Sequence, residues 1–331
     1  MKASTLLSVC LGILPALAWA QSDNKLTVYT YGSFAGKWGP GPNIKQAFEA
    51  ECGCELDLQG LDDGVAILNR LRMEGKTSPA DLILGLDNNL LEEAKQTGLF
   101  ATHQVDTQRI KLPNGWHDEV FIPYDYSYFA FVYNKQKLKN PPQSLRELVY
   151  ERQDIRIIHQ DPRTSTVGQG LMLWMKSVFG DQAPQAWQML SKKTVTVTKG
   201  WSEAYALFLK GEADLVLSYV TSPLYHQMAE QDENYASATF SEGHYMQVEM
   251  AAKLAHSPRQ ALADQFMQFM LSDAAQTEVA LKNWMLPVVA VDLPDAFSQL
   301  ALPTKTLSFD AKQVQQNRRQ WIREWQTALT F

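Results

Sequence analysis

The chain has 331 residues, of which 30 are Lys or Arg and 36 are Asp or Glu, and its formal net charge at pH 7 is −6. This mildly acidic balance does not favour nucleic acid as a partner, since proteins that bind nucleic acid present a basic face. The length is generous for one domain and natural for two. After the N-terminal segment, no run of about 18 apolar residues predicts a membrane-spanning helix.

The first twenty residues have the pattern of a secretory signal peptide. Lys2 supplies the positive start, residues 6–17 form an apolar stretch, and Ala18-Trp-Ala20 is a cleavage site of the small–x–small type. We therefore expect residues 1–20 to be removed and the exported protein to begin near Gln21. Its net charge would be −7, because Lys2 is the only charged residue lost.

Cys52 and Cys54 are the cysteines that remain after this cleavage, in the sequence Cys-Gly-Cys. An oxidising compartment permits a disulfide between them, which would close a very small loop and contribute roughly 1–2 kcal/mol. A structural pin is expected, and a redox role is the alternative. The pair does not predict a zinc site, because no His partners lie nearby.

Strands and helices alternate along the chain. We expect strands at residues 26–31, 54–58, 81–86, 126–133, 156–160, 194–198, 215–219 and 245–254. We expect helices at residues 44–51, 62–74, 88–95, 145–150, 167–179, 184–191, 201–210, 258–271 and 311–329. This order predicts an α/β protein with a mainly parallel sheet covered by helices on both faces.

No repeat, low-complexity tract or long linker separates the two halves of this series. We therefore expect two α/β lobes joined by strands that cross near residues 124–133 and 243–249, with a third crossing near 284–291. The predicted division assigns residues 21–124 and about 245–287 to lobe 1, and residues 125–244 and about 288–331 to lobe 2. Ligands of open α/β sheets bind beyond the C-terminal ends of the strands, so the lobes can share one cleft.

Residues 161–170 form a polar turn between an expected strand and an expected apolar helix, and read Asp-Pro-Arg-Thr-Ser-Thr-Val-Gly-Gln-Gly. The hydroxyls of Thr164, Ser165 and Thr166 lie where free backbone N–H groups and the positive end of a helix dipole are exposed. This arrangement suits an anion or a polar ligand group. An ordinary helix N-cap is the alternative.

Aromatic, acidic and hydroxyl side chains also follow the other expected strands. They are Tyr31, Ser33, Trp38, Asp62, Asp63, Trp201, Ser202, Tyr219, Thr221, Ser222, Tyr225, Asn283 and Trp284. Aromatic faces bind a cationic ring with roughly 0.5–2 kcal/mol each, a carboxylate pairs with its charge, and hydroxyls or helix amides take a polar tail. The set predicts a flat, positively charged heteroaromatic ligand. Single aromatics could instead be core residues, and Asp62 or Asp63 could be helix caps.

Enzymatic motifs are incomplete. The segment from Gly200 to Ala204 lacks the closing glycine of a nucleophile elbow. A dinucleotide fingerprint at Gly168 and Gly170 has Leu173 where its third glycine belongs. The six His residues show no metal-ligand spacing. We therefore expect neither an enzyme nor a bound metal or cofactor.

The sequence resembles the thiamine-binding receptors of bacterial ABC transporters over essentially the whole mature chain. The resemblance rests on these segments in order: Leu26-Thr-Val-Tyr-Thr-Tyr31, Trp38-Gly-Pro-Gly-Pro42, Asn69-Arg-Leu-Arg-Met-Glu-Gly75, Gly85-Leu-Asp-Asn-Asn-Leu90, Asp161-Pro-Arg-Thr-Ser-Thr166, Thr194-Val-Thr-Val-Thr-Lys-Gly-Trp-Ser-Glu-Ala-Tyr205, Leu217-Ser-Tyr219, Ser222-Pro223, Ser241-Glu-Gly-His-Tyr245 and Asn283-Trp-Met285. Asp-Pro-Arg-Thr-Ser alone is shared more widely among type II solute receptors.

The resemblance implies a type II periplasmic-binding-protein fold that captures thiamine, thiamine monophosphate or thiamine diphosphate between two lobes. It also implies a monomer in the periplasm that delivers its ligand to an inner-membrane ABC permease with its ATPase. The ligand contacts that it implies are Asp63, Gly64, Ser165, Thr166, Trp201, Tyr219, Val220, Thr221 and Ser222. Further cleft aromatics are Tyr31, Trp38, Tyr225 and Trp284.

Two alternative functions fit the same fold. One is a receptor for iron or a small oxyanion, in which Tyr219 and Tyr225 would be phenolate ligands. The other is an exported enzyme resembling thiaminase I, which would need a nucleophile in the pocket. Cys52 and Cys54 lie away from the expected strand ends, which disfavours the enzyme.

Overall fold

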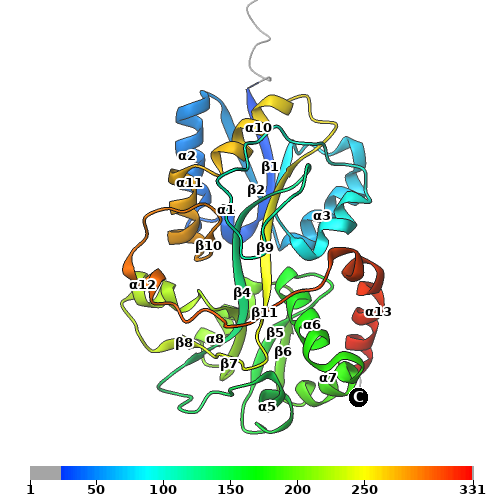
Figure 1. The fold of residues 1–331 in the computed structure, drawn as a ribbon, viewed down its shortest axis with the longest axis vertical. Coiled ribbons are helices and arrows are strands. Elements are labelled where there is room, and N and C mark those ends of the chain that lie inside the picture. Colours follow the sequence, from blue (N-terminus) through cyan, green and yellow to red (C-terminus); the bar gives the residue numbers. More distant parts are fainter. Residues whose placement is uncertain (1–23, 330–331) are drawn as a thin grey trace, which may run out of the picture.

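The structure, a computed structural model, describes residues 24–329. The expected signal peptide and its cleavage site near Ala20 lie outside this range. The described chain forms two α/β halves, one above the other along the long axis of the molecule (Figure 1). Within the described residues, no helix combines the length and apolar character that a membrane span requires.

A single sheet runs through both halves. Its strands follow the order β2-β1-β3-β9-β4-β7-β5-β6, with β10 and β8 paired to β4 and β11 paired to β9. They are β1 (Lys25–Tyr31), β2 (Glu55–Leu61), β3 (Leu82–Asp87), β4 (Ile122–Asn134), β5 (Ile157–Gln160), β6 (Thr194–Thr198), β7 (Leu215–Tyr219), β8 (Tyr235–Ser237), β9 (His244–Lys253), β10 (Leu286–Pro287) and β11 (Thr306–Leu307). The pairings of β1 with β2 and β3, and of β5 with β6 and β7, are parallel as predicted.

β4 and β9 are long antiparallel strands that extend from one half into the other (Figure 1). β4 pairs with β9 along its first part and with β7 along its second part. Both strands fall in the segments where crossings were expected. The expected third crossing contains β10, which also pairs with β4. The assignment of the remaining residues to two lobes stays a prediction.

Helices cover both faces of the sheet. They are α1 (Gly32–Ala35), α2 (Gly41–Cys52), α3 (Gly64–Glu74), α4 (Leu91–Lys95), α5 (Leu145–Tyr150), α6 (Thr166–Phe179), α7 (Ala183–Ser191), α8 (Trp201–Leu209), α9 (Pro223–Tyr225), α10 (Gln260–Phe269), α11 (Asp273–Glu278), α12 (Asp295–Ser298) and α13 (Ala311–Leu329). Short 3-10 turns form at Gly75–Thr77, Asn88–Leu90 and Gly180–Gln182, and π-helical turns at His226–Glu230 and Val279–Asn283.

α2 begins earlier than predicted, at Gly41 rather than at residue 44. Pro42 lies in its first turn, where a proline costs nothing because the N–H it lacks has no intrahelical partner. The helix ends at Gly53, whose φ of 61° is left-handed and therefore favours glycine. A disulfide joins Cys52 to Cys54 around this turn.

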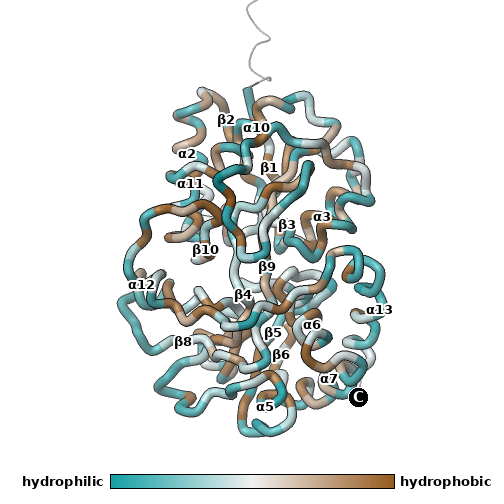
Figure 2. The backbone as a smooth tube through the Cα atoms, in the orientation of Figure 1, coloured by the Kyte–Doolittle hydropathy of each residue, from teal (hydrophilic) through white to brown (hydrophobic). Residues whose placement is uncertain are grey.

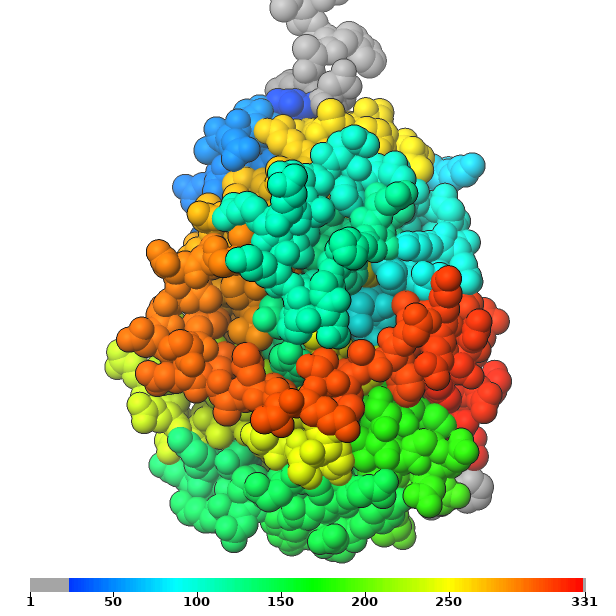
Figure 3. Space-filling view, in the orientation of Figure 1, coloured from blue at the N-terminus to red at the C-terminus, as the bar shows by residue number. Residues whose placement is uncertain are grey.

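α6 and α13 show how helix composition follows position. α6 is buried along nearly its whole length, between the sheet and other helices. α13 is amphipathic, with Val314, Trp321 and Trp325 buried against the same core. Figure 2 shows the corresponding difference in hydropathy between the two helices. The segment that leads from α12 to α13 crosses the middle of the face seen in Figure 3, where β11 pairs with β9.

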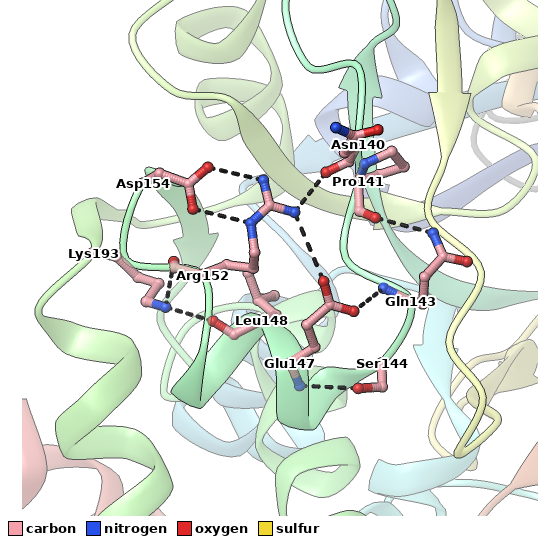
Figure 4. Close-up of polar contacts among 9 residues, drawn as sticks. All are labelled: Asn140, Pro141, Gln143, Ser144, Glu147, Leu148, Arg152, Asp154 and Lys193. Atoms are coloured by element: carbon pink, nitrogen blue, oxygen red, sulfur yellow. Dashed lines mark hydrogen bonds and ion pairs between the residues drawn. The ribbon is translucent and has the colours of Figure 1, made fainter.

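A polar network fixes the two ends of α5 (Figure 4). The Ser144 hydroxyl caps the first turn by accepting a 2.9 Å bond from the N–H of Glu147. The Lys193 ammonium donates a 2.7 Å bond to the carbonyl of Arg152, just past the helix end, and burial lowers the pKa of Lys193 to about 8. The Arg152 guanidinium in turn holds Asp154 through two 2.9 Å bonds. None of these side chains lines the cavity described below, so the network supports the fold.

Candidate functional site

A cavity of about 610 Å³ lies between the two halves. Its walls come from the end of β1, α1 and the loop after it, the starts of α3 and α6, α8, the end of β7, α9, and residues 282–285. The volume is within the range of small-molecule sites. Parallel strands of both halves end here, as expected for an open α/β sheet.

Most of the predicted ligand contacts line this cavity. They are Tyr31, Trp38, Asp63, Gly64, Thr166, Trp201, Tyr219, Ser222, Tyr225 and Trp284. Ser33, Asp62, Ser202 and Asn283, which the strand-end pattern also indicated, line it too. Residues some 250 positions apart in the chain are thus brought to one surface, while their contact with a ligand stays a prediction.

Ser165, Val220 and Thr221 are predicted contacts that lie behind the cavity wall. Ser165 is fully buried at the N-cap of α6, where its hydroxyl accepts a 3.3 Å bond from the N–H of Gly168. The Thr221 hydroxyl bonds that of Ser127 at 3.1 Å. Val220 packs in a small apolar cluster. In this structure these three side chains therefore support the wall and do not form its surface.

Asp63 joins the two halves across the cavity. Its Oδ1 accepts bonds from the N–H of Gly64 at 2.7 Å, the N–H of Thr166 at 2.8 Å and the Thr166 hydroxyl at 2.9 Å. Its Oδ2 accepts a 2.9 Å bond from the Ser165 hydroxyl. The side chain is 5% exposed, and burial raises the pKa of Asp63 against the lowering effect of these bonds. One carboxylate therefore caps its own helix α3 and the start of α6 in the opposite half.

A second contact between the halves lies beside Asp63. Lys199 and Asp62, both exposed, form an ion pair. Gly64 is also close to the opposite half, because a Cβ there would come within 2.8 Å of the Thr166 methyl. The halves thus touch along the start of α3, and the structure is a closed form of the cleft.

The wall on the α8 side is aromatic. The Trp201 ring stacks on Tyr205 with centroids 5.0 Å apart, and Tyr205 stacks on His226 at 5.8 Å. His226 bonds the Tyr205 hydroxyl at 2.9 Å through Nε2 and Glu230 at 2.6 Å through Nδ1. The Trp201 indole N–H donates a 2.7 Å bond to the Ser218 hydroxyl. Packing and hydrogen bonds therefore hold the Trp201 ring in one orientation.

Tyr205 and His226 were not among the predicted site residues. The four-residue spacing of Trp201 and Tyr205 places both on one face of α8, and this was the signal available in the sequence. His226 is fully buried inside a π-helical turn, a rare element that no sequence pattern indicated.

The opposite wall is backed by buried acids. The Tyr31 hydroxyl donates a 2.6 Å bond to Glu249. Asn283 donates 2.8 Å bonds to the Tyr31 hydroxyl and to Asp125. Asp87 accepts a 3.1 Å bond from Gln247, and burial raises the pKa of Asp87 to about 6. Asp87, Asp125 and Glu249 were missed by the sequence analysis. Glu249 lies inside an expected strand and Asp125 just before one, so neither had the strand-end signal, whereas Asp87 directly follows the strand expected at 81–86 and could have been found by it.

Further aromatics surround the mouth of the cavity. Trp38 is 81% exposed, with the Lys37 ammonium 4.8 Å from the centre of its ring. Tyr225 and Trp284 meet edge to face at 5.7 Å. Trp284 has a φ of 56°, which is uncommon for a residue other than glycine. The cavity thus combines rings on several sides with carboxyl groups behind one wall, an arrangement that suits a flat cation.

Comparison with known proteins identifies the family. Residues 41–277 match the family model described as bacterial extracellular solute-binding protein. The chain belongs to this family. Among its relatives, the thiamine-binding periplasmic protein of Escherichia coli K12 is 61% identical over 305 residues, which cover 92% of this chain and 93% of that protein. The thiamine-binding periplasmic protein of Brucella abortus is 48% identical over 322 residues, or 97% of this chain and 96% of that protein.

Solved structures of the family agree with this fold. A periplasmic thiamin binding protein has a TM-score of 0.91 at 61% identity, covering 92% of this chain and 96% of that one. The ferric binding protein of Campylobacter jejuni has a TM-score of 0.76 at 19% identity, covering 92% and 99%, and at that identity shares the fold alone. The predicted α/β fold of the type II periplasmic-binding class is confirmed.

The alternative of an iron receptor has weaker support. A relative named iron uptake protein A1, from Synechocystis, is 25% identical over 260 residues, or 73% of this chain and 71% of that protein. Residues 24–329 contain no group of three or more His, Cys, Asp and Glu placed to hold a metal ion. The Tyr219 hydroxyl donates a 2.7 Å bond to Gln247, and burial raises the pKa of Tyr219, which disfavours the phenolate.

Proposed function

We propose that this family member is a periplasmic receptor that binds thiamine in the cavity between its two halves. The observation that carries the proposal is the 61% identity to a thiamine-binding periplasmic protein over nearly the full length of both chains. The chemistry of the cavity supports it independently. Thiamine is a flat thiazolium cation joined to an aminopyrimidine, and the cavity offers aromatic faces together with buried carboxyl groups.

The proposed contacts divide between the two walls. Trp201, Tyr225 and Trp284 would contact the rings, because these aromatic residues line the cavity. Tyr31 and Asn283 would face the charged side, since each is hydrogen-bonded to a buried carboxyl group. Cation–π contacts of this kind contribute roughly 0.5–2 kcal/mol each once water is excluded.

The finer parts of the proposal concern the ligand set and delivery. Thiamine monophosphate and thiamine diphosphate would bind as well as thiamine, and the receptor would deliver them as a monomer to an inner-membrane ABC permease with its ATPase. Removal of a signal peptide near Ala20 would place it in the periplasm. The two lobes would be residues 21–124 with about 245–287, and 125–244 with about 288–331.

Closure of the cleft follows from the position of Asp63. Its bonds to Ser165 and Thr166 join opposite halves, so they form only when the halves meet. A ligand that contacts both walls favours the closed state by its difference in affinity for the two states. The ligand and the Asp63 bonds would thus stabilise the same closed form.

The chain is a binding protein and not an enzyme, as are the relatives that it matches. The alternative resembling thiaminase I would need a nucleophile at the ligand. Cys52 and Cys54 form a disulfide and neither lines the cavity. Incubation with thiamine and aniline should accordingly give no exchange product.

Native mass spectrometry of protein purified without refolding tests the proposal. The expected result is a complex with one thiamine species, which identifies the ligand and the stoichiometry together. Isothermal titration calorimetry with thiamine after ligand removal should then give a single site. No uptake of thiamine by folded protein would overturn the assignment.

A further inference from the structure

Two carboxyl groups meet on the strands that join the halves. Asp125 of β4 and Glu249 of β9 are direct partners in the antiparallel ladder. Asp125 is fully buried and Glu249 is 6% exposed. Direct partners in an antiparallel ladder have Cβ atoms about 4.5–5.5 Å apart on one face of the sheet, so the two carboxyl groups are close neighbours. Like charges at such a separation cannot both be ionised at low cost in a buried place.

The hydrogen-bond donors around the two carboxyl groups leave one carboxylate oxygen without a donor. Glu249 Oε2 accepts bonds from the hydroxyls of Tyr31 at 2.6 Å and Tyr124 at 2.8 Å. Asp125 Oδ2 accepts a 2.8 Å bond from Asn283. Asp125 Oδ1 is buried and has no N–H or O–H donor among the described residues. A proton shared with Glu249 supplies the donor that this oxygen otherwise lacks.

The surrounding charges favour the protonated pair. Burial raises the pKa of Glu249 to about 7. Burial and the neighbouring Glu249 carboxyl group raise the pKa of Asp125 well above its usual value. Asp63 and Asp87 add further negative charge near Glu249. The tyrosines that face the pair stay protonated, because burial raises the pKa of Tyr31, Tyr124 and Tyr219.

The pair is one side chain away from the cavity. Tyr31 and Asn283 line the cavity and bond directly to Glu249 and Asp125 respectively. Asn283 also bonds the Tyr31 hydroxyl at 2.8 Å, so the four side chains form one connected network. A positive charge beside Tyr31 and Asn283 would lie close enough to stabilise the ionised form of the pair.

We propose that Asp125 and Glu249 determine specificity for a cationic ligand by giving up their shared proton when the ligand binds. The bond that breaks is the carboxyl O–H, its electrons stay on the carboxylate, and the proton passes to the solvent. In the empty cleft the pair holds the proton and carries one negative charge fewer. When the cation binds, the pair loses the proton and carries that additional negative charge. The inference rests on the proposed binding of thiamine.

Calorimetry in two buffers that differ in ionisation enthalpy measures the proton directly. At neutral pH, thiamine binding to the wild-type protein should release a large fraction of one proton per ligand. Asp125→Asn and Glu249→Gln should both bind with that release lost, because neither retains a carboxyl pair. Asp181→Asn is the matched control at an exposed carboxylate outside the cavity, and its release should equal that of the wild type. The ligand is the same in all four proteins, so its own protonation cancels in the comparison.

A pH series and an uncharged analogue complete the test. Because binding releases a proton, wild-type affinity for thiamine should rise with pH across neutrality, and the two variants should lose most of this dependence. Thiochrome, an uncharged oxidation product of thiamine, should bind without proton release. Wild-type enthalpy independent of buffer, undiminished release in both variants, or equal release with thiochrome would overturn the inference. Failure of thiamine to bind at all would instead overturn the proposed function. The wild-type measurement decides the matter if a variant does not fold.

Discussion

Two helices of the lower half begin at the cavity, and their first turns are built differently. α6 begins after Ser165, whose hydroxyl caps the N–H of Gly168, and the N–H of Thr166 is bound by Asp63 from the opposite half. α8 begins after Gly200, which offers no side-chain cap, and its first residues Trp201 and Ser202 line the cavity. The positive end of α6 is thus already paired with a carboxylate of the protein.

The difference between the two helix starts corresponds to two roles, closure of the cleft and recognition of the ligand. The polar turn before α6 has the sequence expected of an anion site, and the anion that it binds in this structure is Asp63. The turn before α8 has a glycine in the same place, and the aromatic residue that follows presents its ring to the cavity. Similar helix starts therefore hold the halves together in one case and form the binding surface in the other.

Among the substitutions that test this difference, Asp63→Ala should have the largest effect on thiamine affinity. It leaves the Thr166 N–H and the Ser165 hydroxyl without their partner from the other half. Losing one partner of a buried charged contact costs about 2–5 kcal/mol, so thiamine affinity should fall by more than tenfold, and by about 30-fold at the lower end of that range. Calorimetry measures the affinity, with Asp181→Ala, at an exposed carboxylate outside the cavity, as the control. An affinity within threefold of wild type would show that Asp63 does not couple closure to binding.

Trp201→Ala should weaken thiamine binding at least tenfold while the fold stays intact, because the ring lies on the cavity surface and stacks on Tyr205. Trp201→Phe should lose less, since it keeps an aromatic face. Calorimetry on the purified variants checks affinity, and circular dichroism checks folding. Unchanged affinity in Trp201→Ala would remove this residue from the site.

Ser165→Ala should have an intermediate effect, mainly on stability. It removes the N-cap of α6, which costs about 1 kcal/mol, and one of the bonds to Asp63. Denaturant unfolding should show that loss, while thiamine affinity falls only about threefold because Thr166 still binds Asp63. A tenfold or larger loss of affinity without loss of stability would mean that Ser165 contacts the ligand itself, as the sequence resemblance implies.

Lys199→Ala should have the smallest effect. It removes an ion pair with Asp62 in which both partners are exposed, and such pairs contribute about 0–1 kcal/mol. Thiamine affinity should change by less than about threefold, and the change should shrink as salt is added. A larger change that persists in high salt would place part of the closure energy in this pair.

The sequence was most informative where local signals decide the structure. α5, β6, β7 and α13 begin and end at, or within one residue of, the predicted positions. Caps and abrupt changes of hydrophobic pattern mark these ends. The prediction was weaker at α1, which forms between the strand expected at 26–31 and the helix expected at 44–51, where no element was expected. It was also weaker at the two π-helical turns, because no local pattern marks an extra residue in a helical turn.

In the cavity, too, the sequence predicts local features better than contacts between residues far apart in the chain. Its aromatic and hydroxyl residues could be predicted, because residues that follow parallel strands meet at one edge of a sheet. The bonds of Asp63 to Ser165 and the contact of Asp125 with Glu249 could not, since each joins residues about a hundred positions or more apart. A helix cap and a cleft carboxylate look alike in sequence until the opposite half is placed beside them.

The pairing of β4 with β9 has a mechanical consequence. Because the two strands are hydrogen-bonded to each other where they pass between the halves, they can bend together but cannot slide past one another without breaking the ladder. Separation of the halves is thereby restricted largely to rotation about one axis. Such a rotation returns Asp63 to the same two residues each time, so repeated cycles of capture and release would reproduce one closed geometry.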